Sequence, residues 1–387
     1  MSLTIRAYNV LFGDCLLVSW DEADGEHHAW IDFGNFHNDP NAVFTSVYDN
    51  VLQRTNGKLD LVVITHRHMD HLEGFYSLRD RFAADFEIDR IWYAHVTPSL
   101  DNQFQIAGQA IRELAPRKAW MGDGILGRIY RNNFGAQALT IIDRMNSVLN
   151  TLRYTSAHTV HRESNMAHIM PDGLDRLKIE ILAPEQDSSI YLEPLHDALG
   201  FRPHLDAYFK GATSGAQPSN VEDDYVRPMA QKAIDSPLMQ LADFARLRRK
   251  LRTGGLNILA AADKTRNNTS VVLALTYRGK RLLLTGDAEE KSWQIMRQKG
   301  LDLSSRLIKV AHHGSINASP CWSYRAVLTR RRKSNAVIVS TEPTRYTGKN
   351  EVPKEEVLDG WRDRLSVQER LKTTDGVLLG SYEEITF

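Results

Sequence analysis

The chain of 387 residues has few cysteines, no long apolar run and no excess of either charge. Its 2 cysteines, Cys15 and Cys321, are too few for the disulfide framework of a small secreted domain. No run of about 18 apolar residues occurs, so we expect no membrane span and no membrane partner. The first residues lack a basic flank followed by an apolar core, so we expect no signal peptide and a cytoplasmic location.

The acidic and basic residues balance. There are 48 Lys and Arg against 48 Asp and Glu, which gives a formal net charge of +0. This balance argues against a protein whose whole surface binds nucleic acid, although it is compatible with a local basic groove. Hydrophobic residues make up 42% and charged residues 25% of the chain, which is ordinary for a globular protein.

Alternating and apolar segments predict an α/β protein, because strands and helices follow one another along the chain. Helices are expected at 41–54 and 71–82. Strands are expected in two segments of 3–20, near 30–34, and at 59–64, 88–94, 177–182, 270–276, 281–284, 307–311 and 336–340. We therefore predict a single domain over 1–387 with two insertions, a mostly helical one at about 100–175 and another at about 185–262.

The run 65–71 is the most informative stretch, because it places three imidazoles and one carboxylate within six residues. It directly follows the apolar run 61–64, which reads as a buried strand. Side chains at the end of a buried strand are held rigidly, as a metal site requires. Imidazole nitrogen with carboxylate oxygen suits Zn²⁺ and also Mn²⁺ or Fe²⁺.

Three later polar groups also appear where strands are expected to end. Asp32 follows Trp30-Ile31, Asp287 follows the apolar run 282–284, and His312-His313 follow the run 308–311. In α/β folds, ligands converge at such strand ends. A carboxylate placed between two cations can bridge them, and Asp287 is the natural candidate.

These motifs resemble those of the metallo-β-lactamase superfamily. The His-x-His-x-Asp-His motif of that family is matched by His66, His68, Asp70 and His71. The resemblance implies a four-layer αβ/βα sandwich with a one- or two-metal site at the edge of its sheets. It also implies that Asp287 is the aspartate that bridges the metals and that His312 or His313 is the last histidine ligand along the chain. Asp32 would accept hydrogen bonds from the ligand imidazoles and so orient them.

Within the superfamily, the chain is most similar to the hydrolase domain of DNA-uptake competence (ComEC-like) proteins. The matching pieces are 10–14, 31–34, 267–273, 284–287, 312–315 and 374–376. Many superfamily members take a third histidine for the first metal from mid-chain. His95, His158, His161 and His168 are candidates, and ordinary loop histidines are the alternative reading of each.

The resemblance implies two divalent metal ions, Zn most favoured, with Mn or Fe as alternatives. His66 and His68 would hold the first, and Asp70, His71 and His313 the second, with Asp287 bridging. Cations about 3.5–4 Å apart can hold a hydroxide that attacks phosphorus. Asp70 and His312 are therefore the predicted catalytic residues. Successive strand residues face opposite sides, so we place His313 on the metal and His312 near the substrate or leaving group.

Substrate contacts are the least determined part of the sequence. Ser315 and Asn268 could contact a phosphate, and a structural turn role is the alternative. A capped amphipathic helix is expected at 236–252, and its basic end includes Arg248 and Arg249. We expect its apolar face to pack on the domain or on a second subunit in a homodimer. Its basic end would then select an anionic substrate, such as a nucleic acid or nucleotide; a solvated helix end is the plainer reading.

The leading hypothesis is a hydrolase of phosphodiesters, either a nuclease or a nucleotide phosphodiesterase. Hydrolysis of an ester, thioester or lactam is the second, because a metal-held hydroxide supports it equally. A non-catalytic, metal-binding regulatory module is the third. Nothing in the sequence identifies the substrate, and fold alone does not determine a reaction.

Overall fold

The computed structural model describes residues 2–35, 41–97, 100–101, 104, 125–134, 140–199, 259–345 and 351–387. The chain forms two compact units. The first comprises Met1–Val96, Gly135–Ser188 and Arg266–Phe387, and the second comprises Thr97–Phe134 and Ser189–Thr265. Both sheets and the candidate site belong to the first unit. The interpretation as one domain with two insertions stays a prediction.

A seven-stranded sheet has the order β13-β1-β2-β3-β4-β5-β6. β13, β1, β2 and β3 pair antiparallel, and β3 to β6 pair parallel. The strands are β1 (Leu3–Tyr8), β2 (Cys15–Asp21), β3 (Glu26–Phe33), β4 (Lys58–Ile64), β5 (Glu87–Ala94), β6 (Tyr154–Val160) and β13 (Tyr382–Thr386).

A six-stranded sheet has the order β12-β11-β10-β9-β8-β7. Its strands from β9 to β12 are parallel, whereas β7, β8 and β9 pair antiparallel. The strands are β7 (Leu177–Ala183), β8 (Val272–Tyr277), β9 (Lys280–Leu284), β10 (Leu307–Lys309), β11 (Ala336–Val339) and β12 (Leu371–Thr373).

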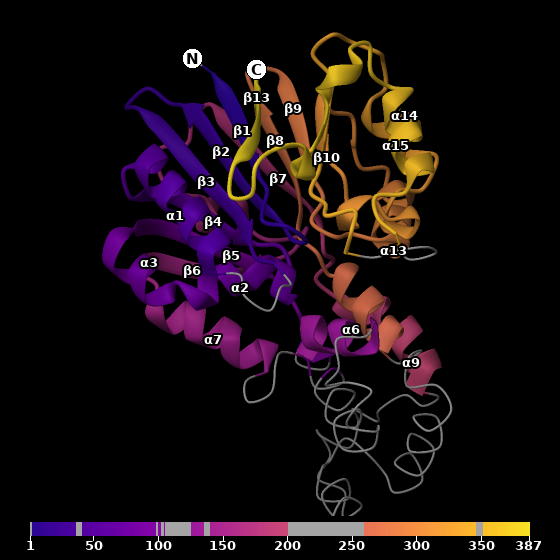
Figure 1. Ribbon diagram of the computed structural model, residues 1–387, viewed down its shortest axis with the longest axis horizontal. Coiled ribbons are helices and arrows are strands. Elements are labelled where there is room, and N and C mark those ends of the chain that lie inside the picture. Colours follow the sequence, from indigo (N-terminus) through magenta and orange to yellow (C-terminus); the bar gives the residue numbers. More distant parts are fainter. Residues whose placement is uncertain are drawn as a thin grey trace, which may run out of the picture. The chain divides into compact units, whose positions relative to one another are not determined.

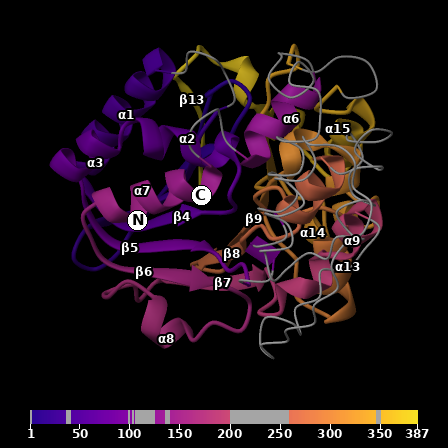
Figure 2. The same cartoon turned by 90° about the horizontal axis from the view of Figure 1, so that it is seen from below.

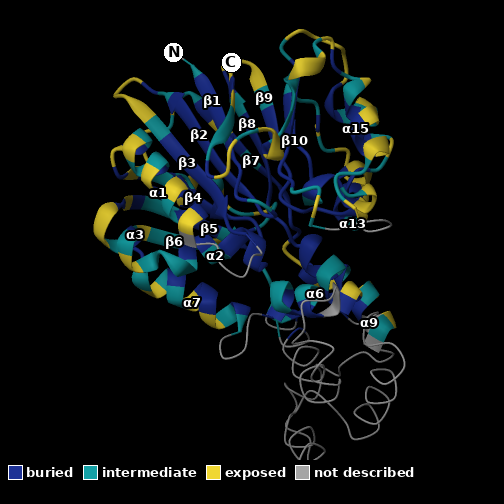
Figure 3. Cartoon of the chain, viewed as in Figure 1, coloured by how far each residue is buried: buried dark blue, intermediate teal, exposed yellow. Residues whose placement is uncertain are grey.

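The two sheets pack face to face, and helices cover their outer faces (Figures 1 and 2). Side chains from both sheets, such as Val63 and Leu273, form one buried core between them. A second core lies under the helices of the seven-stranded sheet and a third under those of the six-stranded sheet. The strands are accordingly buried on both faces over most of their length (Figure 3). The expected four-layer αβ/βα sandwich is confirmed.

The helices that cover the seven-stranded sheet are α1 (Asn41–Thr55), α2 (Met69–Ser77), α3 (Arg79–Asp85) and α7 (Ile141–Thr151). Those that cover the six-stranded sheet are α13 (Glu290–Gln298), α14 (Ser323–Val327) and α15 (Glu355–Arg362). The first unit also contains α8 (Met166–Ile169). The second unit contains α6 (Ile125–Phe134) and α9 (Glu193–Leu199). In the described part of the chain, no helix is both long and apolar enough to cross a membrane.

Most expected strands are present, but three strands were missed, and all three lie at sheet edges. β6 falls in the segment 100–175, which was expected to be mostly helical. β12 and β13 fall where no strand was expected. Edge strands need fewer apolar residues, and Tyr-Thr-Ser-Ala-His-Thr-Val in β6 carries little of the pattern that reveals a buried strand.

Two further expectations need correction, and one cannot be compared. The helix expected at 71–82 is two helices, because Leu78, between α2 and α3, has a non-helical ψ of 14°. The strand expected at 307–311 ends at Lys309. The expected helix 236–252, with Arg248, Arg249 and the homodimer contact, lies outside the described residues.

Candidate metal centre

The candidate site lies where four strands end. β3 and β4 are parallel neighbours in one sheet, and β9 and β10 are parallel neighbours in the other. Asp32 is the penultimate residue of β3, the histidine run follows β4, and Asp287 follows β9. A hydrogen bond of 2.8 Å from Val271 N to Thr65 O links segments next to β8 and β4. Segments far apart in sequence therefore meet at this edge of the sandwich.

Four fully buried side chains come together there, and we call them the inner cluster: Asp70, His71, Asp287 and His313. Each offers one ligand atom, and the four atoms lie within 4.8 Å of one another. His71 Nε2 is 3.2 Å from Asp287 Oδ2, while His313 Nε2 is 3.4 Å from Asp70 Oδ2. Two imidazoles and two carboxylates suit Zn²⁺, Mn²⁺ or Fe²⁺. The inner cluster could therefore hold a divalent cation.

Acceptors outside the inner cluster fix both of its imidazoles. His71 Nδ1 lies 2.8 Å from Asp32 Oδ2, and Asp32 also accepts hydrogen bonds of 2.7 Å from the backbone N and Oγ1 of Thr65. His313 Nδ1 donates to the backbone O of Ser340 at 3.0 Å. Because each Nδ1 is engaged, each Nε2 is directed into the cluster. Histidines that bind metals are typically oriented in this way.

Histidines and carboxylates in the inner cluster stabilise one another's charged forms. Burial by itself lowers the pKa of His71, but three neighbouring carboxylates overcome burial and raise that pKa well above its ordinary value. These carboxylates belong to Asp287, Asp32 and Asp70. Burial acts to raise the pKa of Asp287, but His71 and His313 outweigh it and hold that pKa well below the usual range. The cluster thus keeps its carboxylates ionised, as metal ligands must be.

His66 and His68 lie beside the inner cluster and face each other. His66 Nε2 is 2.9 Å from His68 Nδ1, and the His66 and His71 ring centroids are 4.1 Å apart. Burial, with the nearby His71 and His68, lowers the pKa of His66 well below its ordinary value. The imidazole of His66 is therefore neutral, which is the form that binds metals.

Backbone packing brings the run 65–71 against the loops that follow β1 and β3. Asp14 N donates to Asp70 O at 3.0 Å. A Cβ added to Gly34 would lie 2.4 Å from Met69 O, so only glycine allows the end of β3 to approach so closely.

The two histidines after β10 lie in a tight turn. His312 has a φ of 47° and His313 a φ of 53°, so both occupy the left-handed region. The expectation that they alternate along an extended strand is therefore wrong. This backbone costs a non-glycine residue about 1–3 kcal/mol, and such strain is common at functional sites. The turn leaves His313 fully buried and 23% of the His312 side chain exposed.

A buried carboxylate, which the sequence analysis missed, accompanies His312. Glu289 is 1% exposed, and its Oε1 lies 3.1 Å from His312 Nδ1 and accepts a hydrogen bond of 2.9 Å from Asn267 Nδ2. His312 N also donates to Asp287 Oδ1 at 3.1 Å. The only sequence signal for Glu289 was its position two residues after Asp287.

The predicted substrate residues make contacts within the protein. Asn268 Oδ1 accepts a hydrogen bond of 3.0 Å from Ser292 N in the first turn of α13, and Ser315 Oγ donates to Asn317 Oδ1. These contacts fit the structural-turn alternative for both residues. Their roles in substrate binding, like the catalytic roles of Asp70 and His312, stay predictions.

The mid-chain histidines do not join the inner cluster. The His95 and His161 rings are 5.1 Å apart, and His158 Nε2 lies 2.8 Å from Ser156 Oγ on β6. His168 lies in α8. Among the residues that the structure describes, the groups of ligand atoms suited to a metal include none of these histidines.

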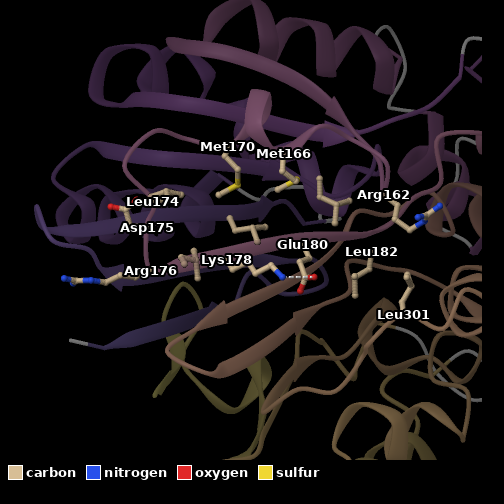
Figure 4. A pocket seen from close by; sticks show the side chains of 13 residues that line it. Arg162, Met166, Met170, Leu174, Asp175, Arg176, Lys178, Glu180, Leu182 and Leu301 are labelled. Carbon is tan, nitrogen blue, oxygen red and sulfur yellow. Dashed lines mark hydrogen bonds and ion pairs between the residues drawn. The ribbon is translucent and has the colours of Figure 1, made fainter.

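A pocket of about 630 Å³ lies away from the inner cluster (Figure 4). The edge strand β7 forms one wall, and Met166, Met170 and Leu174 contribute to the lining. Lys178 and Glu180 on β7 form an ion pair of 3.3 Å in this pocket. No histidine is among the residues that line it, and none of the inner cluster is.

Comparisons with known proteins find similarity among solved structures. No protein-family model matches the chain, and no curated protein matches it. The chain is similar to the metallo-β-lactamase fold protein YhfI from Bacillus subtilis, with a TM-score of 0.41 and 9% identity, covering 100% of both chains. At this level of similarity no activity carries over to the chain, and its fold is defined by its own two sheets and their helices.

Proposed function

We propose that this protein is a metal-dependent hydrolase of the metallo-β-lactamase superfamily and that it acts on phosphodiesters. The observation that carries the proposal is the inner cluster. Four buried ligand groups converge from two sheets, and both imidazoles are already oriented by acceptors behind them. Such preorganisation is what a functional metal site requires.

The inner cluster fits one divalent cation. We assign the second cation to the neighbouring His66 and His68, which would supply two imidazole ligands. Bound divalent cations act as Lewis acids and supply a nucleophile at neutral pH. Asp32 and Ser340 keep the inner imidazoles in place, and the buried strands around the site exclude bulk water. His312 is held by Glu289 with part of its ring exposed, so it is placed to contact a substrate.

Positive charge beside the metal motif supports an anionic substrate. Arg67 lies within the motif and is partly exposed, whereas Arg266, which is 3% exposed, donates to Arg67 O at 3.0 Å and so helps to hold that segment. Arginine is well suited to phosphate recognition because its planar group offers several donors. We therefore favour a phosphodiester, such as a nucleotide or nucleic acid, over an ester, thioester or lactam.

The test begins with metal content and then compares substrates. Protein purified without chelator should contain close to two equivalents of Zn, Mn or Fe by elemental analysis. The loaded protein should hydrolyse a generic phosphodiester faster than a thioester or a lactam. Asp287→Asn should lower kcat/KM by about a thousandfold or more, because the charge that holds the cations is lost.

The matched control is Asp80→Asn, since the Asp80 side chain is 83% exposed and lies on the surface helix α3. That variant should keep full activity. Activity that survives His68→Ala with Asp70→Ala would place the reaction elsewhere. If the protein bound no transition metal after reconstitution, the proposed metal site would be wrong. If it preferred the thioester or the lactam, the proposed substrate would be wrong.

A further inference from the structure

A lysine lies buried behind the inner cluster. Lys309 is the last residue of β10, in the otherwise apolar strand Leu-Ile-Lys, and it is 1% exposed. A lysine is almost never buried to this extent unless its charge is paired, because removing an ammonium group from water is costly. The surroundings of its Nζ therefore indicate what the residue does.

The Lys309 ammonium group contacts carboxylates on two segments. Nζ forms an ion pair with Asp14 Oδ2, donates to the backbone O of Gly286 at 3.2 Å and lies 3.6 Å from Asp287 Oδ1. A buried ammonium group with one carboxylate paired to it and a second one nearby is stabilised in its charged form.

The two oxygens of Asp287 face different partners. Oδ1 lies 3.6 Å from Lys309 Nζ and accepts a hydrogen bond of 3.1 Å from His312 N. Oδ2 lies 3.2 Å from His71 Nε2 and 3.7 Å from His313 Nε2, on the side of the inner cluster. Lys309 thus lies near Oδ1 of Asp287, whereas Oδ2 faces the inner cluster, where a divalent cation would bind.

Four buried carboxylates lie within this region: Asp14, Asp32, Asp70 and Asp287. Without compensation, several buried negative charges repel one another and destabilise the fold. A bound divalent cation would compensate them, and so does a fixed ammonium group. Lys309 and a bound metal ion would therefore both compensate the negative charge of Asp287, each near a different oxygen of its carboxylate.

We propose that Lys309 is an internal counter-cation. Its charge stabilises the fold of the metal-free protein by compensating the buried carboxylates at this site. The same charge lowers the affinity of the site for divalent cations. This inference rests on the metal site of the proposed function. It makes Lys309 a residue that acts through Asp287 and Asp14 rather than one that contacts substrate.

The test is Lys309→Met, which removes the charge and keeps a chain of similar length. Two quantities are measured: the Kd for Zn²⁺, by competition with a chromophoric chelator, and the Tm with and without Zn²⁺. Without metal, the variant should melt several degrees below the unaltered protein, because buried carboxylates lose their partner. Its affinity for Zn²⁺ should rise on the order of tenfold or more, since a repelling unit charge is gone.

By linkage, tighter binding must appear as a larger stabilisation by metal. Zn²⁺ should therefore raise the Tm of Lys309→Met by about 2 °C or more beyond the rise that it gives in the unaltered protein. A lysine with a merely structural role predicts otherwise: equal losses of Tm with and without metal, and an unchanged Kd. Either that result or a weaker affinity would overturn the proposal.

Removing both charges of the pair provides the second variant. Lys309→Met with Asp14→Asn should be more stable without metal than Lys309→Met alone, because neutral groups replace the buried ion pair as a unit. If the single variant does not fold, the double variant is used for the same measurement. It also lacks the ammonium group beside Asp287, so a lower Kd for Zn²⁺ supports the proposal and an unchanged or higher Kd contradicts it.

The proposed function fails in a different way, because the unaltered protein itself would then bind no metal. The two failures are therefore distinguishable.

Discussion

The inner cluster and the neighbouring pair His66–His68 differ in what their imidazoles contact. In the inner cluster, the Nδ1 atoms of His71 and His313 are engaged by acceptors outside it, and the Nε2 atoms point inward. His66 Nδ1 is likewise held, 3.2 Å from Thr65 Oγ1, but His66 Nε2 and His68 Nδ1 are directed at each other across 2.9 Å. A cation at this pair would have to replace that contact, whereas one at the inner cluster would find its ligands already oriented and would displace only the proton that the carboxylates favour on His71. We therefore expect the inner cluster to bind its cation more tightly.

Among the variants that test this comparison, the largest effect is expected from removing the acceptor of the His71 Nδ1 hydrogen bond. Asp32→Asn keeps the shape of the side chain but loses its charge and one of its acceptor functions. It should weaken binding of the first equivalent of Zn²⁺ by about 10–100-fold, the usual cost of losing such a partner. The second equivalent should change less, because Asp32 contacts His71 directly but reaches His66 only through Thr65 Oγ1, which lies 3.2 Å from His66 Nδ1. Stepwise Zn²⁺ titration measures both.

A matched control for Asp32 lies on the same sheet. Asp60, on β4, also pairs with a histidine, since its Oδ1 lies 2.7 Å from His27 Nδ1. Asp60→Asn should leave both Zn²⁺ affinities unchanged. Equal weakening of both equivalents by Asp32→Asn would remove the distinction between the two halves of the site.

A smaller effect is expected from Glu289, which holds His312 outside the inner cluster. Glu289→Gln preserves the size of the side chain and removes its charge. Metal content should stay the same, while kcat/KM for the phosphodiester should fall about tenfold, because charged hydrogen bonds contribute about 1.5–3 kcal/mol. Glu290→Gln is the control, since Glu290 is exposed and accepts a hydrogen bond of 2.9 Å from Gln294 within α13. Loss of metal in Glu289→Gln would instead make Glu289 part of the metal site.

The parts of the site that the sequence analysis anticipated are those encoded locally. His66, His68, Asp70 and His71 form a contiguous motif after an apolar strand, and Asp287 directly follows another such strand. Strand ends gather at one edge of a sheet, so the convergence of these groups could be inferred from the α/β pattern.

The parts that were missed depend on contacts between distant segments. Lys309 meets Asp14 across 295 positions of sequence, and no local pattern encodes that pairing. The turn at His312 and His313 was missed because both residues adopt positive φ, which the sequence does not favour. The edge strands β6, β12 and β13 were missed because a strand with one free edge needs little apolar character.

The smallest expected effect tests how burial and nearby carboxylates set the charge of histidines on the seven-stranded sheet. His28, on β3 of the same sheet, is also buried, but its Nδ1 contacts the hydroxyl of Ser19 at 2.8 Å. Burial lowers its pKa to about 4. His71, surrounded by carboxylates, shifts in the opposite direction. Burial alone therefore gives a neutral histidine, and carboxylates reverse the result.

Because the folded pKa of His28 lies below its unfolded value of 6.5, the unfolded chain binds more protons between those values. The contribution of His28 to stability is thus complete above pH 6.5 and is lost as the pH falls from 6.5 towards 4. From pH 7 to pH 6 the loss should be about 0.7 kcal/mol. His28→Gln, which can still bond Ser19, should reduce the change in unfolding free energy between pH 7 and pH 6, measured by urea unfolding, by that amount. His27→Gln should do the opposite, because Asp24 and Asp60 overcome burial and raise the pKa of His27. Equal pH dependence in all three proteins would mean that burial does not suppress the charge of His28.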